Sequence, residues 1–480
     1  MYGNAFMAFL KRVYNVLFVV VLIVALYYLL VDDGYHFSPQ YLVDNSSLKG
    51  REFAAEVKEI TSPKLGIKAY LLEERSNPLV NVSFDFRRAG RAYEPQNRQG
   101  LNRLLSQMLL AGAGKYDVKA FQKQLNQKAI SLSFSSDADD FYGALRFVAK
   151  DADTAANLLN LALTKPQFKK DELKKARQNS LETYARAQEN PESWLSVQTS
   201  SKLFGAHPYG RNPYGSPQTL KQVTAADMRG FMRRHFTRDN LLVGLSGDIG
   251  AEQAAQLLDK MFAGLPAQNK GSNLPEVKID YTVPLQSFKH PSQQTLISFF
   301  APAPTRSDAD FYPIELALDE LAGGSLSSRF HRQAREAEGL TYGAYAYTTH
   351  NDKMAQIIGY SSATPDKVAA LLAVIRQEWQ KLGDKGLSES ELERVKKRFI
   401  GANVLRFADS QNIANTLVMM QKFNLGADFL RRRNDYIRNV NLDDVNTAVK
   451  KYFSADNLRF FELRGLTEME TEKDNGKDRK

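Results

Sequence analysis

The stretch "DMRGFMRRHFTRDNLLVGLSGD" (residues 227–248) occurs again, in altered form, as "DVNTAVKKYFSADNLRFFELRG" (444–465). Both copies have an aromatic pair, then Asp-Asn-Leu, then a run typical of a strand. Other segments repeat in the same order and at similar offsets: "LLAGAG" and "LAGGS" (from 109 and 321), "DTAANLL" and "DKVAALL" (from 153 and 366), and "DELKKAR" and "SELERVKKR" (from 171 and 390). This pattern indicates two copies of one α+β unit of roughly 200 residues.

Local patterns divide the chain further. Apolar and polar residues alternate as in strands, or repeat every three to four positions as in helices. The predicted strands are 64–74, 79–90 and 241–250, and the predicted helices are 97–111, 118–129, 154–163 and 169–189. The stretch "LPAQNKGSNLPE" (265–276) has the Pro, Gly, Asn and Ser content of a linker. The sequence therefore predicts a first domain at 59–264, a linker at 265–278 and a second domain at 279–466.

Composition excludes several classes of protein. The 480 residues are 43% hydrophobic and 11% aromatic, as in a folded protein. The net charge of +10 is modest for this length, and no compact basic block interleaved with aromatics occurs, so we expect no nucleic-acid partner. The chain has no cysteine, which excludes disulfides, thiolate nucleophiles and cysteine-bound zinc.

The N-terminus has the features of a membrane anchor. Residues 13–31 carry no charge, and at 1.5 Å per residue they span roughly 28 Å, close to a bilayer core. Lys11 and Arg12 precede the span and acidic residues follow it, which predicts a cytoplasmic N-terminus. We therefore expect an anchor at 1–31, a single-pass inner-membrane protein and a soluble part in the periplasm or otherwise outside the cytoplasm. A cleaved signal peptide is the alternative. A polar stalk (32–58) and a charged tail (467–480) complete the predicted organisation.

Three stretches resemble the pitrilysin/insulinase family of inverzincin-type zinc metallopeptidases, in its short two-domain form. The first, "GLNRLLSQMLLAGAGK" (100–115), is similar to the family's Gly-Leu-x-His-x-x-Glu-His helix and following turn. The second (206–248) contains "HPYG" and a helix that leads into a strand, and the third is "LAGGSLSSRFHRQAREAEGLTYGAYAY" (321–347). The resemblance covers roughly 60–465 and implies two α/β-sandwich domains like those of the processing peptidases.

The resemblance also implies that the zinc site has been lost. Two histidines four positions apart on a helix hold Zn²⁺ in such enzymes, and the glutamate between them activates water. The matching positions here are Arg103, Ser106 and Gln107, none of which replaces those groups. Glu182, in the stretch "NSLETYARAQENPE", matches the family's third ligand and is the predicted remnant; a solvated helix residue is the simpler interpretation.

No local pair of histidines offers another metal site. The histidines are His36, His207, His235, His290, His331 and His350, and no two of them have the spacing of a helical ligand pair. A site assembled from distant segments would make the chain a self-sufficient peptidase, and that hypothesis predicts stoichiometric zinc in the purified protein. A lone histidine before proline, such as His207, is interpreted as a structural turn residue.

The third stretch predicts a helix–strand corner. Leu326 and Phe330 are four positions apart and share one face of a helix predicted over 325–336. The following segment 340–348 alternates like a strand. The residues predicted on one face of that strand are Leu340, Tyr342, Ala344 and Ala346.

Arg335 ends the predicted helix and Tyr342 begins the predicted strand, and a helix–strand corner can bring two such side chains to one place. A guanidinium and a phenol both donate hydrogen bonds, and both stabilise an oxyanion without ionising. The alternative is structural: Arg335 pairs with a glutamate, and Tyr342 packs in the core.

The resemblance favours the catalytic interpretation. In the family's short branch one chain holds zinc, and a partner chain without the motif supplies the matching Arg and Tyr, which bind the carbonyl of the peptide bond to be cleaved. The sequence therefore predicts a membrane-anchored, zinc-less subunit of a heteromeric metalloendopeptidase. It would have no cofactor of its own, a zinc-bearing partner of the same family and a peptide or unfolded protein as substrate. A non-catalytic peptide-binding or scaffold protein of the same fold is the alternative.

Overall fold

The computed structural model describes residues 56–465, except 272, 282, 284, 291, 293, 325 and 407–409. The predicted anchor (1–31), nearly all of the predicted stalk (32–58) and the predicted tail (467–480) lie outside the described residues. None of the helices that the structure describes is both long enough and apolar enough to cross a membrane. The described residues belong to one compact unit of the chain.

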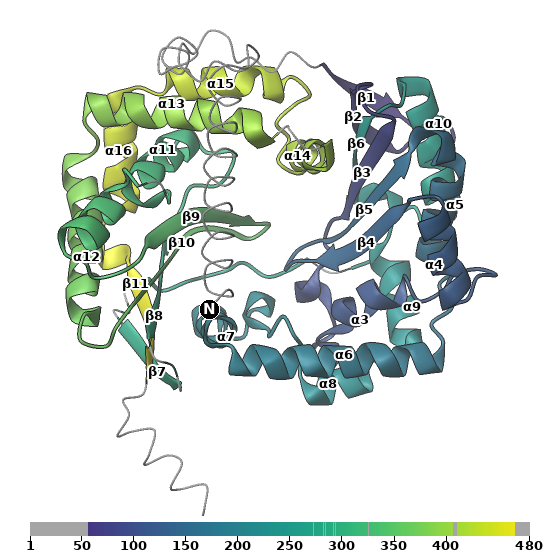
Figure 1. Ribbon diagram of the computed structural model, residues 1–480, viewed down its shortest axis with the longest axis horizontal. Helices are drawn as coiled ribbons and strands as arrows, with labels where there is room; N and C mark the ends of the chain where they lie inside the picture. The colour runs from purple at the N-terminus through teal and green to yellow at the C-terminus, as the bar shows by residue number, and fades with distance from the viewer. Residues whose placement is uncertain are drawn as a thin grey trace, which may run out of the picture. The chain divides into compact units, whose positions relative to one another are not determined.

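Within the described residues, six strands form the first sheet, in the order β1-β2-β6-β3-β5-β4 (Figure 1). They are β1 (Val57–Thr61), β2 (Lys68–Glu73), β3 (Leu79–Phe86), β4 (Ser131–Ser136), β5 (Phe141–Val148) and β6 (Leu241–Gly247). β2 and β6 are parallel, and the other neighbours are antiparallel. β6 is the strand of the first repeat copy, and it lies inside the sheet between β2 and β3.

In the same part of the chain, five strands form the second sheet, in the order β7-β11-β8-β10-β9. They are β7 (Leu285–His290), β8 (Thr295–Pro302), β9 (Ala344–Asn351), β10 (Met354–Ala363) and β11 (Arg459–Gly465). β11, the strand of the second repeat copy, is parallel to β7 and antiparallel to β8. The two sheets share one topology apart from the additional β1, which confirms the prediction of two homologous α+β domains.

The cores of the two sheets share a packing detail. On the first sheet, Phe84 of β3 lies opposite Gly143 of β5, and on the second, Phe299 of β8 lies opposite Gly359 of β10. Both phenylalanines are completely buried. A Cβ at Gly143 would approach the Phe84 ring to 2.2 Å, and one at Gly359 would approach the Phe299 ring to 1.9 Å. Glycine is therefore required at both positions because an aromatic ring occupies the space of its side chain.

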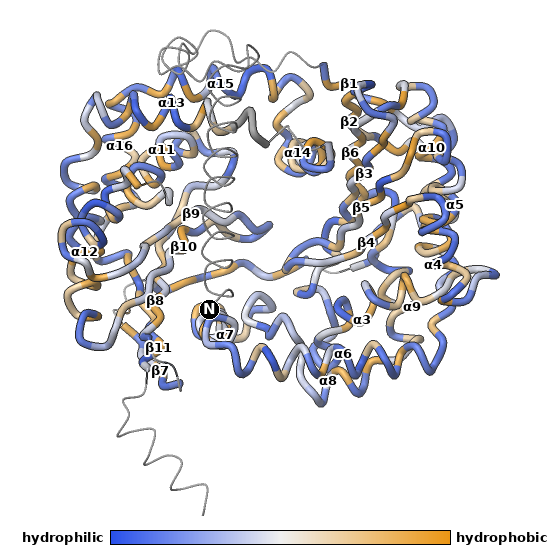
Figure 2. The backbone as a smooth tube through the Cα atoms, viewed as in Figure 1, coloured by the Kyte–Doolittle hydropathy of each residue, from blue (hydrophilic) through white to orange (hydrophobic). Residues whose placement is uncertain are grey.

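Helices enclose a hydrophobic core against the first sheet, whose strands are among the most apolar segments in Figure 2. These helices are α3 (Leu101–Met108), α4 (Val118–Gln127), α5 (Ala152–Thr164), α6 (Lys170–Glu189), α8 (Pro217–Gln222), α9 (Ala225–His235) and α10 (Ala251–Phe262). On the second sheet, α11 contacts β9 and α12 contacts β10, and further helices pack behind them. The helices of this second group are α11 (Phe311–Ala322), α12 (Val368–Lys385), α13 (Glu389–Arg406), α15 (Phe429–Asn439) and α16 (Leu442–Tyr452).

Two helices are exchanged between the halves of the chain. α14 (Ser410–Lys422), from the second half, packs on β6, β3 and β2 of the first sheet. α7 (Pro191–Phe204), from the first half, packs on β11 and β8 of the second sheet. Each follows the helix that contains the "DELKKAR" or "SELERVKKR" repeat, so the exchange is reciprocal between equivalent elements. The ranges predicted for the two domains therefore each include one helix that covers the other domain's sheet.

Candidate functional site

The helix of the altered zinc motif, α3, begins at a buried carboxylate. Gly100 precedes the helix with φ +89°, a left-handed conformation that glycine adopts readily. The backbone N–H groups of Gly100 and Asn102 donate to Glu94, at 2.8 and 2.6 Å. Because Glu94 satisfies these first donors, the helix starts at Leu101, later than the predicted 97–111.

The structure brings the three altered positions together on one face of α3. The Arg103 guanidinium lies over the ring of Tyr214, 5.1 Å from its centroid. The Ser106 hydroxyl donates to the Arg103 carbonyl at 3.0 Å, and the Gln107 amide donates to that carbonyl and to the Ser180 hydroxyl, both at 3.0 Å. All three side chains line a cavity of about 330 Å³, which we call the α3 cavity.

Glu182 does not join this cavity. It is exposed, and its carboxylate accepts a hydrogen bond from Gln178 at 3.0 Å. The residues of α6 that line the α3 cavity are Asn179 and Thr183, which are four positions apart and share a face. Glu182 is turned about 100° from Thr183 around the helix. Glu182 is therefore a solvated helix residue, as the simpler interpretation predicts, and Thr183 is the residue of α6 that faces the cavity at this level.

The described residues include no group of three His, Cys, Asp or Glu side chains placed to hold a metal ion. His207 makes turn contacts: its Nδ1 accepts from the Tyr209 N–H at 3.2 Å, and its Nε2 lies 3.1 Å from the Pro275 carbonyl. His36 lies outside the described residues.

The predicted helix–strand corner differs in its details. The helical residues begin at 329, and His331–Ala337 form π-helical turns instead of the helix predicted over 325–336. Leu326 is 67% exposed whereas Phe330 is completely buried, so the two do not share a buried face. β9 begins only at Ala344, which leaves Tyr342 in the connection before the strand.

Tyr342 is 81% exposed, while Leu340, Ala344 and Ala346 are buried. The expectation that all four share one face of a strand is therefore wrong, because the strand periodicity does not extend back to Tyr342. The structural alternative, in which Tyr342 packs in the core, is also wrong. Arg335 is exposed, and within the described part of the chain its side chain makes no hydrogen bond or ion pair.

Tyr342 lines a second cavity, of about 590 Å³, which we call the tyrosine cavity. Its walls come from α7 of the first half and from β8, β9 and β10 of the second sheet, and Arg335 is not among its lining residues. Its aromatic members are Tyr214, Tyr342, Tyr345 and Tyr360. Tyr214 also lies against Arg103, so a residue of the tyrosine cavity contacts a residue of the α3 cavity.

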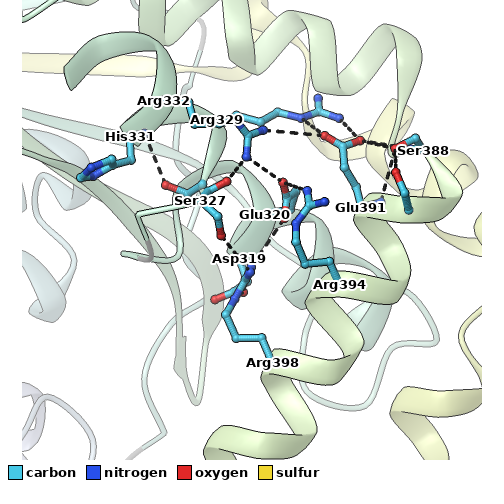
Figure 3. Close-up of polar contacts among 12 residues, drawn as sticks. Asp319, Glu320, Ser327, Arg329, His331, Arg332, Ser388, Glu391, Arg394 and Arg398 are labelled. Atoms are coloured by element: carbon cyan, nitrogen blue, oxygen red, sulfur yellow. Dashed lines mark hydrogen bonds and ion pairs between the residues drawn. The ribbon is translucent and has the colours of Figure 1, made fainter. Parts of the chain in front are cut away.

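An ion-pair network anchors the segment that precedes Arg335 (Figure 3). Arg329 donates through Nε and Nη2 to the two oxygens of Glu391 at 3.0 and 2.8 Å, and Nη2 also donates to the Gly386 carbonyl at 2.9 Å. Arg394 donates to the buried Glu320 at 2.6 Å, and Arg398 donates to Asp319 at 2.7 Å. Burial alone would raise the pKa of Glu391, but Arg329 and the Ser388 donors lower it to about 2.

The Arg329 network was not predicted from the sequence. The only available signal was the Ser-Arg pair within 321–347, because Glu391 is far along the chain and on a different helix. The network attaches the π-helical segment to α13 and so positions the chain on which Arg335 lies.

This fold and this site define a metallopeptidase-type chain whose zinc position has lost its ligands. Family models match both halves of the chain: "Insulinase (Peptidase family M16)" over residues 71–216 and "Peptidase M16 inactive domain" over 222–399. The chain belongs to this peptidase family, M16, which is the pitrilysin/insulinase family, and its second half matches the family's inactive-domain model.

Similar proteins include both inactive and uncharacterised members. The "Non-peptidase homolog YmxG" of Helicobacter pylori is 22% identical over 78% of this chain and 86% of its own length. An "Uncharacterized zinc protease" of Rickettsia felis is 24% identical over 77% of this chain and 88% of its own length. The crystal structure of a peptidase M16 inactive domain from Pseudomonas fluorescens superposes with a TM-score of 0.78 at 22% identity, and covers 86% of this chain and 98% of that one.

Proposed function

We propose that this chain is the zinc-less subunit of a heteromeric metalloendopeptidase. It binds peptide and provides Arg335 and Tyr342, while a zinc-bearing partner of the same family provides Zn²⁺ and the glutamate that activates water. The single observation that supports this most strongly is the combination of lost ligands at α3 with Tyr342, which is 81% exposed at the wall of a cavity.

The donor groups of Arg335 and Tyr342 each suit an oxyanion. When water attacks a peptide carbonyl, negative charge develops on the carbonyl oxygen, and preorganised donors stabilise it. Tyr342 offers an O–H and Arg335 offers several N–H groups, and neither is used by another described side chain.

The second sheet offers a surface for an extended peptide. β9 is the last strand of that sheet among the described residues, so one side of its backbone is available for pairing. Tyr345 and Tyr347 on β9 are 48% and 50% exposed. A peptide added beside β9 would form main-chain hydrogen bonds, and its side chains would contact these rings.

The membrane location belongs to the same proposal. The uncharged segment 13–31, with basic residues before it, supports a single anchor in the inner membrane and a peptidase-like body in the periplasm. Such an anchor would confine the complex to substrates at the membrane surface.

The test is peptide hydrolysis by the full-length chain together with the zinc-bearing protein that co-purifies with it. Tyr342→Phe or Arg335→Ala should lower kcat by roughly 10²–10³, as the loss of one oxyanion donor does. The matched controls are Tyr116→Phe and Arg432→Ala, which remove the same groups far from the cavities and should leave activity unchanged. Wild-type turnover by both test variants, or peptide cleavage by this chain alone, would overturn the proposal.

The printed name of the Helicobacter pylori relative, a non-peptidase homolog, favours a second candidate: a scaffold or peptide-binding protein of the same fold. The two functions predict different complexes. A stable assembly without zinc and without hydrolysis supports the scaffold, whereas a zinc-bearing partner with hydrolysis that depends on Tyr342 supports the split enzyme.

A further inference from the structure

Polar side chains from four elements line the α3 cavity. Arg91 comes from the 3₁₀ turn Arg91–Tyr93, Arg103 and Ser106 from α3, Ser135 and Ser136 from the end of β4, and Thr183 from α6. Its volume of about 330 Å³ is at the lower end of the roughly 300–1,000 Å³ typical of small-molecule sites. The cavity is therefore large enough for a small ligand, and its wall is polar.

Two cations, Arg91 and Arg103, line the α3 cavity. Neither Arg91 nor Arg103 has an ion-pair partner among the described residues, and the Nε atoms of both are buried without a hydrogen-bond acceptor there. The Arg103 guanidinium contacts the Tyr214 ring, and burial lowers its pKa, so the protein environment opposes its positive charge. An anion in the cavity would offset that cost.

One carboxylate, Glu94, also faces the cavity and attracts both arginines without pairing with either. Both of its oxygens already accept backbone N–H groups, from Gly100 and Asn102 at the start of α3. Burial raises its pKa to about 7, although these N–H groups oppose the rise. Glu94 therefore serves as a helix cap, and the donors of the two arginines that face the cavity are left for a ligand.

We infer that the α3 cavity is a binding site for a phosphate-type oxyanion, either free or as a phosphate monoester. Guanidinium groups are donors that match acceptor-only phosphate oxygens. The hydroxyls of Ser106 and Thr183 already donate to backbone carbonyls, at 3.0 and 2.8 Å, so the two arginines supply the charged donors. Arg91 and Arg103 come from different elements and line the same cavity, which suits a tetrahedral anion that two guanidinium groups contact; a planar carboxylate is satisfied by one arginine in a bidentate pair. The position equivalent to the family's zinc site thus favours an anion instead of a metal cation, because its two arginines repel a divalent cation.

The inference does not depend on a partner subunit, so it is tested on the purified full-length chain. Isothermal titration with inorganic phosphate, at constant ionic strength against chloride, should show saturable binding. A phosphate monoester such as glycerol 3-phosphate distinguishes the two sources of the group, since tighter binding than inorganic phosphate identifies the monoester as the ligand. Weaker monoester binding identifies the free ion.

The variants locate the site. Arg103→Gln should weaken phosphate binding by about tenfold or more, because a hydrogen-bonded charge is lost. Arg91→Gln provides an independent variant if Arg103→Gln does not fold. Arg376→Gln is the matched control: its guanidinium also lies over a ring, that of Phe460 at 4.4 Å, but far from the cavity, and it should bind phosphate as the wild type does.

Three results would contradict the inference. They are no saturable binding of phosphate or monoester, equal binding by the wild type and all cavity variants, and acetate binding as tight as phosphate binding. These outcomes leave the proposed role of Tyr342 untouched, because that role is measured by hydrolysis.

Discussion

At the residue scale, the two domains depend on the same contact between a phenylalanine and a glycine. Phe84 with Gly143 and Phe299 with Gly359 occupy equivalent places in the two sheets, each pair facing across two neighbouring antiparallel strands. In each pair a buried ring lies where a side chain of the neighbouring strand would otherwise stand. The two copies of the repeat therefore share this phenylalanine–glycine contact as well as the order of their strands.

We expect Gly359→Ala to destabilise the second domain by about 1–3 kcal/mol, because the new methyl group overlaps the fully buried Phe299 ring. Chemical denaturation followed by tryptophan fluorescence measures this, since Trp379 contacts Phe299. The double variant Gly359→Ala/Phe299→Leu should recover part of the loss, a coupling that a double-mutant cycle detects. Gly250→Ala, where a methyl group meets only ordinary contacts, serves as the control. If Gly359→Ala cost no more than Gly250→Ala, and its effect simply added to that of Phe299→Leu, the Phe299 ring would not be the reason that position 359 requires glycine.

At the scale of elements, the junction between α11, the π-helical segment and α13 is electrostatic. Arg329 is 8% exposed and pairs with Glu391, while Glu320 beneath them is completely buried between Arg394 and Arg332, at 2.6 and 3.5 Å. Removing one member of such a network leaves the others buried without a partner. The segment that precedes Arg335 and Tyr342 is therefore held in place by charge pairing.

The pH dependence of stability should report this junction. The pKa of Glu391 is about 2 in the folded chain and about 4.3 when unfolded, so its stabilising contribution is complete above about pH 4.3. That contribution is lost as the pH falls toward 2. Glu391→Gln should lower the free energy of unfolding by about 2 kcal/mol at neutral pH. Below about pH 4.3, the free energy of unfolding of this variant should fall less steeply with decreasing pH than that of the wild type.

Urea denaturation at several pH values measures the slope. The control is Glu393→Gln, whose carboxylate pairs with Lys396 and is 45% exposed, and which should match the wild type within error. Identical slopes for Glu391→Gln and the wild type would mean that Glu391 titrates normally in the folded chain.

At the scale of the whole described unit, the exchanged helices join the halves of the chain. α14 lies with its backbone against β6, where a Cβ at Gly244 would come within 2.4 Å of the Ala414 carbonyl oxygen. Ser83 and Ser246 of the first sheet bond to Asn415 and to the Ser410 carbonyl, at 2.5 and 2.6 Å. The β9–β10 turn adds a second joint, in which Asp352 pairs with Arg87 at 2.8 Å.

Gly244→Leu should therefore separate α14 from the first sheet and lower stability by about 1–3 kcal/mol. Hydrogen exchange locates the effect: amides of 410–422 should lose protection, while those of β5 keep theirs. Gly230→Ala, on α9 with only an ordinary contact, is the control and should preserve protection in both regions. Loss of protection throughout β5 would show instead that the first domain unfolds as a whole.

The sequence by itself determined the repeated α+β unit, the family and the lost zinc ligands. Each of these depends on local order: the aromatic pair before Asp-Asn-Leu predicts one strand, and a spacing of three and four places Arg103, Ser106 and Gln107 on one helix face. Such patterns are properties of neighbouring residues, so they are readable without a tertiary structure.

Only the tertiary structure decided which distant groups meet. Spacing along the chain suggested Glu182 as a ligand, but the rotation of α6 presents Thr183 to the cavity. Strand alternation placed Tyr342 in a buried row, but β9 starts only at Ala344 and leaves that ring exposed. Other features also join segments that are distant in the chain: the helix exchange, the Arg329–Glu391 pair and the positively charged α3 cavity. Their partners are set by the tertiary fold and not by spacing along the sequence.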